Sequence, residues 1–296
     1  MASCFCGSSS STLIREEIRG GKQRDILRCD RCGAVRKNDL DVERHEQVQE
    51  EGEQIGELDL DPLSDSYTER NMVDVNRRQR ALKGLLRGDE RLLDFGTGMG
   101  HFLEAIDGEV PEVVGSELNT RRIEFVRREL GYEVVRGTEA LLEEYGPNSF
   151  DVVTMFHVLE HLPRPVAQLK QVHELLTDDG LLVVEVPNYD DWLLSVSQSY
   201  ADFYYQDAHA YYFSPRTLYL ALVMGGFGSE ISGVQRYGYR NAKHWLQAGE
   251  PEIDAPSRYD GTWSDVPNAL YSRLLGVFDR SDTLWAVAEP TEPLAL

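Results

Sequence analysis

The sequence predicts an α/β protein built on a mostly parallel sheet with helices on both faces, preceded by a small module that carries cysteines. Three observations support this prediction. From about residue 70 onward, short apolar runs typical of strands alternate with amphipathic segments typical of helices. A glycine-rich loop directly follows the first of these runs. The four cysteines all lie within the first 32 residues of the 296-residue chain.

The N-terminal module, residues 1–38, is predicted from two close cysteine pairs that are each followed by glycine: Cys4 and Cys6, Cys29 and Cys32. Two such pairs suit one structural zinc ion held by four thiolates, with no open coordination position. Between the pairs, residues 12–29 indicate two short strands around the Gly20-Gly21 turn. The module resembles a zinc ribbon, but its first pair is spaced C-x-C where the ribbon usually has C-x-x-C. A disulfide is the alternative, which a cytoplasmic chain disfavours.

Residues 39–66 are acidic and poor in aromatic side chains, which predicts a linker or loosely held arm. The main domain, residues 67–296, begins with a helix at 70–87, where Met72, Val75 and Leu82 share one face. Strands are expected at 91–95, 112–117, 132–137, 150–158 and 181–187, with two more inside 228–239 and 282–290.

Further helices are expected directly after the glycine loop and at 120–130, 138–145, 166–176 and 216–225. Asn119, Thr138 and Ser214 are the expected N-caps of three of them. The connection 240–280 is long for a hairpin and predicts a cap over the substrate pocket. Because the strands are apolar and alternate with helices, the sheet should be parallel and covered on both faces. Ligands on such sheets bind beyond the carboxyl ends of the strands.

The glycine loop is part of LLDFGTGMG, residues 92–100. Its spacing is G-x-G-x-G, one residue tighter than the G-x-G-x-x-G of dinucleotide-binding loops. Asp94 stands two residues before the first glycine. A carboxylate there would be a poor neighbour for a pyrophosphate and a good neighbour for an ammonium group.

With these features the sequence resembles the class I S-adenosylmethionine-dependent methyltransferases of the methyltransferase-23 type. LLDFGTGMG matches the first motif of that family, and Glu117 ends the second strand where the family has an acidic residue. GTEALL (137–142), SFDVVTMFHVLEHL (149–162) and LLTDDGLLVVEVPN (175–188) match later motifs. The resemblance covers about residues 70–230 and implies a Rossmann-like, seven-stranded, mostly parallel sheet.

The resemblance implies S-adenosylmethionine as cofactor. Amides of the glycine loop would face its carboxylate, Asp94 its ammonium and Glu117 its ribose hydroxyls. Thr138 or Glu139 would accept from the adenine amine, and Phe156 would cover the ring. The complete expected set is Asp94, Gly96, Thr97, Gly98, Gly100, Glu117, Leu118, Thr138, Glu139 and Phe156. The alternative for Gly98 and Gly100 is that they only permit close packing of helix and strand.

Methyl transfer to a hydroxyl or acidic carbon is helped by a general base. In the sugar and quinone methyltransferases that the sequence resembles, a Glu-His pair borders the reaction site, which points to Glu160 and His161. The alternative is that His161 only bonds to backbone. HVLEH also fits an inverted zinc-protease pattern, but it follows a buried strand and Pro163 would cut its helix short.

A third candidate, His209, lies in an aromatic-rich segment, residues 188–215, and with Tyr211 resembles a recurrent His-x-Tyr-x-Phe-Ser-Pro string of the same enzymes. This segment suggests a lid or substrate wall, or else a second small core.

Composition narrows the partners. Fifty-one acidic residues against thirty basic ones give a net charge of −21, which disfavours nucleic acid and anionic membranes and resembles halophilic proteins. No apolar run is long enough to span a bilayer, and a signal-peptide pattern is absent, so a soluble cytoplasmic protein is expected. The expected activity is methyl transfer to a small molecule, such as a sugar or sugar nucleotide of surface polysaccharide synthesis. The alternatives are an RNA methyltransferase or a non-catalytic docking protein. The oligomeric state stays open.

Overall fold

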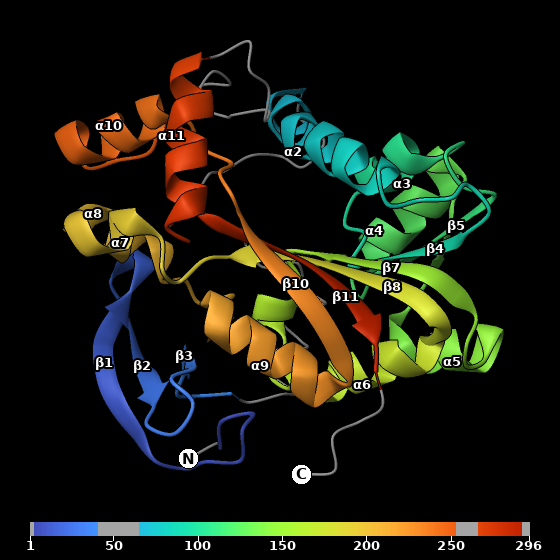
Figure 1. The fold of residues 1–296 in the computed structure, drawn as a ribbon, viewed down its shortest axis with the longest axis horizontal. Helices are drawn as coiled ribbons and strands as arrows, with labels where there is room; N and C mark the ends of the chain where they lie inside the picture. The colour runs from blue at the N-terminus through green and yellow to red at the C-terminus, as the bar shows by residue number, and fades with distance from the viewer. Residues whose placement is uncertain (1–2, 41–64, 253–265, 292–296) are drawn as a thin grey trace.

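The computed structural model describes residues 3–40, 65–252 and 266–291, with side chains in the first helix, α2 (Asp65–Lys83), described from residue 71 onward. The described part contains a seven-stranded and a four-stranded sheet (Figure 1). Most of the expected acidic arm lies outside the described residues.

The seven-stranded sheet has the order β10-β11-β8-β7-β4-β5-β6. Its central pairs are parallel, whereas β11 is antiparallel to both β8 and β10. The predicted sheet is therefore confirmed, including its closing antiparallel hairpin. The strands are β4 (Arg91–Phe95), β5 (Glu112–Ser116), β6 (Glu133–Val135), β7 (Phe150–Phe156), β8 (Leu176–Pro187), β10 (Phe227–Val234) and β11 (Thr283–Pro290).

Adjacent residues of the central strands face opposite sides of the sheet, as the two-residue period of a strand requires. On β4, Leu92 packs in the cluster beneath α2 and α3, whereas Leu93 packs in the cluster beneath α5, α6 and α9. Both faces are covered, which explains the near-continuous apolar runs of these strands. The helices are α2 (Asp65–Lys83), α3 (His101–Ile106), α4 (Thr120–Phe125), α5 (Gly137–Tyr145), α6 (Pro165–Leu175) and α9 (Pro215–Gly225).

Two of the three expected helix caps are confirmed. The Asn119 side chain accepts a hydrogen bond from the Arg122 amide, and Ser214 forms a reciprocal capping box with Thr217. The prediction for Thr138 was wrong, because α5 begins at Gly137 and Thr138 lies inside its first turn. There the Thr138 hydroxyl accepts a hydrogen bond from the Gln168 side chain at 2.6 Å.

The four-stranded sheet joins the N-terminal module to the main domain. Strands β1 (Ser11–Ile18), β2 (Lys22–Cys29) and β3 (Val35–Lys37) are continued by β9 (Tyr211–Tyr212), which comes from the aromatic segment. The first two strands were predicted, and the other two were not. The blue strands lie beside α7 (Trp192–Val196) and α8 (Gln198–Tyr204) in Figure 1.

Much of the aromatic segment forms a second small core. Tyr204, Tyr205 and Tyr212 pack with Ile18 and Ile26 of the module. In the region expected to be a cap, helices α10 (Tyr239–Ala248) and α11 (Val266–Val277) are described, and residues 253–265 lie outside the described part. Within the described ranges, none of the helices combines the length and apolarity needed to cross a membrane.

Candidate functional site

The glycine loop runs from the end of β4 to the start of α3. Gly96 has φ 84°, and a Cβ placed on it would lie 2.3 Å from a methyl carbon of Val158. Gly100 has φ 83°, and its Cβ would lie 2.7 Å from the Leu130 side chain. Only glycine combines this left-handed backbone with such close neighbours. Gly98 instead faces open space, so close packing explains Gly100 but not Gly98.

The side chain of Asp94 holds the glycine loop by hydrogen bonds. Its carboxylate accepts hydrogen bonds from the hydroxyls of Thr97 at 2.8 Å and Thr154 at 2.7 Å. Burial raises the pKa of Asp94, although these two hydroxyls and the charge of Arg78 oppose the rise. The carboxylate is thus hydrogen-bonded to the glycine loop through Thr97.

Glu117 connects the loop to the end of β5. Its Oε2 accepts from the Gly98 amide at 3.0 Å, and its Oε1 accepts from the amides of Leu118 and Asn119 at 2.8 and 3.0 Å. A carboxylate has about four lone-pair positions, so Oε2 keeps capacity for a further donor. The side chain is therefore held in place while remaining able to accept from a ligand.

In the sheet, β6 is the neighbour of β5, so the chain that follows β6 lies on the side of Glu117 away from the glycine loop. A methyl carbon of Leu118 lies close to Gly137, the first residue of α5. A Cβ added to Gly137 would lie 3.5 Å from this carbon, an ordinary van der Waals distance. Glu139 is exposed in the first turn of α5. The ends of β4, β5 and β6 thus bring backbone and polar groups of the glycine loop, Glu117 and the start of α5 to the same edge of the sheet.

Phe156 does not have the surroundings expected for an adenine cover. Its ring is packed edge-on against Phe102 at 4.9 Å and stacked on Trp285 at 5.6 Å, in the cluster beneath α2. The Arg78 guanidinium lies 4.8 Å above the same ring. Because protein groups already surround the ring, we correct the expectation and place Phe156 in the core.

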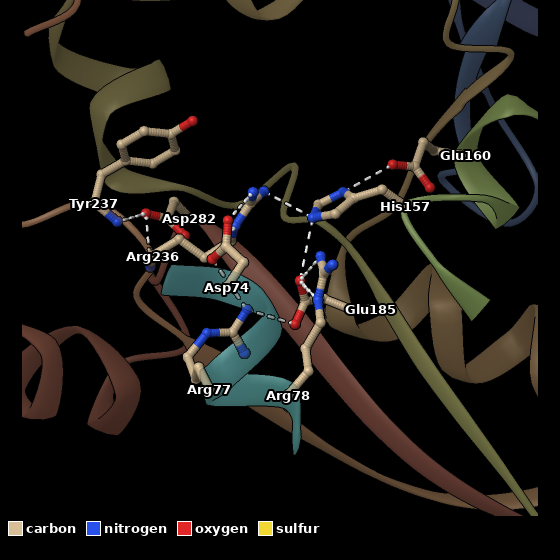
Figure 2. Close-up of polar contacts among 9 residues, drawn as sticks. All are labelled: Asp74, Arg77, Arg78, His157, Glu160, Glu185, Arg236, Tyr237 and Asp282. Atoms are coloured by element: carbon tan, nitrogen blue, oxygen red, sulfur yellow. Dashed lines mark hydrogen bonds and ion pairs between the residues drawn. The ribbon is translucent and has the colours of Figure 1, made fainter. Parts of the chain in front are cut away.

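His157, at the end of β7, joins two polar groups of side chains (Figure 2). Its Nδ1 lies 3.1 Å from Glu160 Oε1, and its Nε2 lies 2.7 Å from an Arg236 nitrogen and 3.2 Å from Glu185 Oε1. A guanidinium can only donate and a carboxylate can only accept, so the contacts of Nε2 to Arg236 and Glu185 oppose each other. The shorter contact, to Arg236, favours Nε2 as acceptor and Nδ1 as donor to Glu160. The residue has φ 57°, a conformation that non-glycine residues adopt only under constraint.

The rest of this network is a buried set of ion pairs. Glu185, fully buried in β8, accepts from Arg77 at 2.8 Å and from Arg78 at 2.6 Å. Asp74 pairs with Arg236 at 2.6 Å. Burial alone would raise the pKa of Glu185, but Arg78 and Arg77 hold it well below its ordinary value. Helix α2 is thereby tied by ion pairs to Glu185 of β8 and to Arg236, which follows β10.

The side chains of His161 and His209 lie next to each other and close to Glu160. Their rings are 4.9 Å apart, and His161 Nδ1 lies 2.9 Å from the Ala208 carbonyl oxygen, to which it must donate. The expected backbone bond of His161 is thus present, and its Nε2 keeps a free lone pair. Burial, followed by the neighbouring His161, holds the pKa of His209 well below its ordinary value, so His209 is neutral.

The four cysteine sulfurs lie within 4.8 Å of one another. The Sγ atoms of Cys4 and Cys32, and those of Cys6 and Cys29, are 3.6 Å apart. This separation is much longer than a disulfide bond of about 2.05 Å. It is close to the edge of about 3.8 Å that Zn–S bonds of about 2.3 Å give a tetrahedron. The cysteines are free thiols arranged as a metal-binding set requires.

Sequence reasoning missed the ion-pair network. One signal was present: Glu185 is a charged residue inside the apolar run LLVVEVP, and a buried charge requires partners. Asp74 and Arg236 carry no comparable signal, because they sit in polar segments and meet only in the folded chain.

A family model described as a methyltransferase domain matches residues 66–228, more than half of the chain. A curated ubiquinone biosynthesis O-methyltransferase of Idiomarina loihiensis is 30% identical over 116 residues, which cover 36% of this chain and 47% of the relative. The chain thus spans about half the length of the curated relatives it matches.

Two solved structures show the same fold. A SAM-dependent methyltransferase from Archaeoglobus fulgidus matches 74% of this chain and 94% of its own, with 23% identity and a TM-score of 0.52. A protein from Pyrococcus horikoshii matches 79% and 97%, with 14% identity and a TM-score of 0.53.

Proposed function

Because the chain belongs to the methyltransferase-domain family and has its class I fold, we propose that it transfers the methyl group of S-adenosylmethionine to an oxygen of a small molecule. The observation that carries this proposal is the fixed geometry of Glu117, whose carboxylate is tied to the Gly98 amide and still has acceptor capacity. The two ribose hydroxyls of the cofactor can donate hydrogen bonds to a carboxylate held in this way beside the glycine loop.

The residues fit the cofactor along the ends of three strands. The open backbone at Gly98 gives room for the methionine part, in a loop to which the Asp94 carboxylate is hydrogen-bonded. Glu117 would accept from the ribose hydroxyls, while Leu118 and the first turn of α5, with Thr138 and Glu139, would bound the adenine. When bound, S-adenosylmethionine supplies a methyl group on a cationic sulfur, and the protein aligns the acceptor with it and excludes water.

The acceptor side is proposed to lie at Glu160 and His161, beyond the end of β7. The free Nε2 of His161 can take a proton from a hydroxyl, because its Nδ1 already donates to Ala208. The matched relatives are named O-methyltransferases, which supports an oxygen acceptor. Sugar hydroxyls, expected from the sequence, are one member of this class, and polyhydric phenols are another.

Calorimetric titration with S-adenosylmethionine tests the cofactor site. We expect the wild-type chain to bind it and the Glu117→Ala variant to bind it about 10- to 100-fold more weakly, because a hydrogen bond to a charged group is worth about 1.5–3 kcal/mol. The matched control is Glu124→Ala, an exposed position of α4, with NAD as the control ligand. Equal affinity in both variants would contradict the site, and a folded chain that binds nothing would support the docking-protein alternative.

We further propose that Cys4, Cys6, Cys29 and Cys32 hold one structural zinc ion. Two tight turns support this, since the Gly7 amide donates to the Cys4 carbonyl and the Gly33 amide to the Cys29 carbonyl. The Ala34 amide also approaches the Cys32 sulfur at 3.5 Å, as amides do around zinc thiolates.

Elemental analysis of the purified chain tests this proposal. We expect about one zinc ion per chain in the wild type and none retained by the Cys29→Ser, Cys32→Ser double variant, because two thiolates bind zinc far more weakly than four. The thiols should react with a thiol reagent only after a chelator is added. A metal-free chain whose four thiols react at once would contradict the proposal.

A further inference from the structure

A second group of ligand-type side chains lies at the main site, well separated in sequence from the cysteines. One oxygen of Glu160 and one ring nitrogen each of His161 and His209 lie within 4.8 Å of one another. We propose that these three residues bind a divalent transition-metal ion. Binding of the ion does not depend on the methyl-transfer proposal, but its role described below does.

Two of the three donor atoms are buried and without partners. Glu160 is 1% exposed, and its Oε2 has no hydrogen-bond partner among the described residues. His209 is 5% exposed, and its Nδ1 is likewise unpartnered. Leaving a buried polar atom unpaired costs about 1–3 kcal/mol, so two such atoms facing the same place indicate a ligand.

The third donor, His161, is already oriented for this task. Its Nδ1 donates to the Ala208 carbonyl oxygen, which leaves the Nε2 lone pair 4.0 Å from Glu160 Oε1. Bonds of about 2.1 Å to a tetrahedral ion would place two ligand atoms about 3.4 Å apart. The His161 ring is partly exposed, so it can adjust to bring Nε2 to this distance from the Glu160 oxygen that binds the ion.

The surrounding residues provide the outer hydrogen bonds that metal ligands usually have. His157 Nδ1 donates to Glu160 Oε1, so Oε2 is the oxygen directed to the ion. The side-chain amide nitrogen of Gln206 lies 2.9 Å from His209 Nε2. The proposal requires this amide to be turned over, so that its oxygen faces the ring. With the amide oxygen turned toward it, Nε2–H donates to Gln206 and the Nδ1 lone pair is free, a choice that hydrogen-bond networks decide.

The ligand set defines the class of ion. Two imidazoles and one carboxylate suit Zn²⁺, Co²⁺, Fe²⁺ or Mn²⁺ rather than Mg²⁺ or Ca²⁺, which prefer oxygen ligands. Three protein ligands leave open positions, in contrast to the closed set of four cysteines. Under the proposed function, an acceptor hydroxyl would occupy one of these positions, and the ion would lower its pKa and hold its oxygen beside the methyl group. With the ion bound, His161 Nε2 is a ligand and not the base, and the hydroxyl would lose its proton to water.

Titration with Co²⁺, followed by visible absorption, tests the inference on chains whose cysteines are first loaded with zinc. We expect about one equivalent of Co²⁺ to bind with weak d–d bands and without the strong near-ultraviolet band of cobalt thiolates. Glu160→Gln, which keeps the shape of the side chain, and His161→Ala, at a partly exposed position, should each weaken binding at least tenfold. The control is His244→Ala, at a partly exposed position of α10.

Two results would overturn the inference: no Co²⁺ bound by the folded wild-type chain, or the same affinity in Glu160→Gln and His161→Ala as in His244→Ala. If the strong near-ultraviolet band of cobalt thiolates appeared and the weak d–d bands of a site without thiolates did not, all Co²⁺ would be bound by the cysteines. This result would also overturn the inference. Calorimetry with S-adenosylmethionine on the same samples separates the two proposals. A chain that binds the cofactor but not Co²⁺ disproves only the metal site.

Discussion

Replacing Glu185 by alanine should destabilise the chain by about 3–5 kcal/mol, because it leaves Arg77 and Arg78 buried without their shared partner. The side chain is fully buried in β8, so water cannot readily replace its carboxylate. Urea denaturation followed by circular dichroism measures the change in the free energy of unfolding. The Glu185→Gln variant should lose less, since the amide oxygen still accepts from one guanidinium.

The matched control is Glu230→Ala on β10, where the side chain is exposed and a change within about 0.5 kcal/mol is expected. If Glu185→Ala cost less than about 1 kcal/mol, the two arginines would have found other partners, and the network would not be what fixes α2 to the sheet. A change in the slope of the denaturation curve would instead indicate loss of two-state unfolding.

Asp191 should make the chain less stable as the pH rises from about 4 to 7. Burial and the nearby Asp282 raise its pKa to about 7 from an ordinary 3.8, even though Tyr200 and the Leu193 amide bond to its carboxylate. Between these two values the folded chain keeps a proton that the unfolded chain has lost. Stability therefore falls with rising pH, by about 4 kcal/mol for a shift of this size.

The Asp191→Asn variant isolates this contribution. Asparagine keeps an oxygen for the Leu193 amide, and its NH₂ group can donate to the Tyr200 hydroxyl in place of the present bond. Urea denaturation of both chains at pH 4, 5, 6, 7 and 8 should show similar stability at pH 4. The advantage of the variant should then grow by about 1.4 kcal/mol per pH unit up to about pH 7 and level off above it. A constant difference across this range would show that Asp191 stays ionised throughout.

The sequence predicted the sheet well because the signals of its strands are local. The apolar runs at 91–95 and 150–158 fall on β4 and β7, and the glycine loop begins where β4 ends. The position of Glu117, directly after β5 and beside the glycine loop, was also predicted, because it depends on a single strand boundary. Its further bonds to the loop amide were not readable, because they join residues 19 positions apart.

What the sequence could not predict depends on pairings between distant segments. Nothing near Tyr211 indicates that it pairs with β3, at residues 35–37. The role of Phe156 was misjudged for the same reason, because Trp285, which stacks on it, comes from the last strand. The side of a buried strand on which a residue lies is decided by the partners that cover it, and a continuous apolar run does not reveal that choice.

The pairing of β3 with β9 also sets an order of events during synthesis. Ribosomes add about 5–20 residues per second, so β9 emerges roughly 10 to 35 s after β3. Until then β3 presents an open strand edge, to which other chains could add. The cysteine cluster next to β2 is complete by residue 32, so a zinc ion held there, as proposed, would stabilise the nascent hairpin throughout this interval. Strands β1 to β3 of the four-stranded sheet can thus pair first, and β9 completes this sheet only after most of the chain has been synthesised.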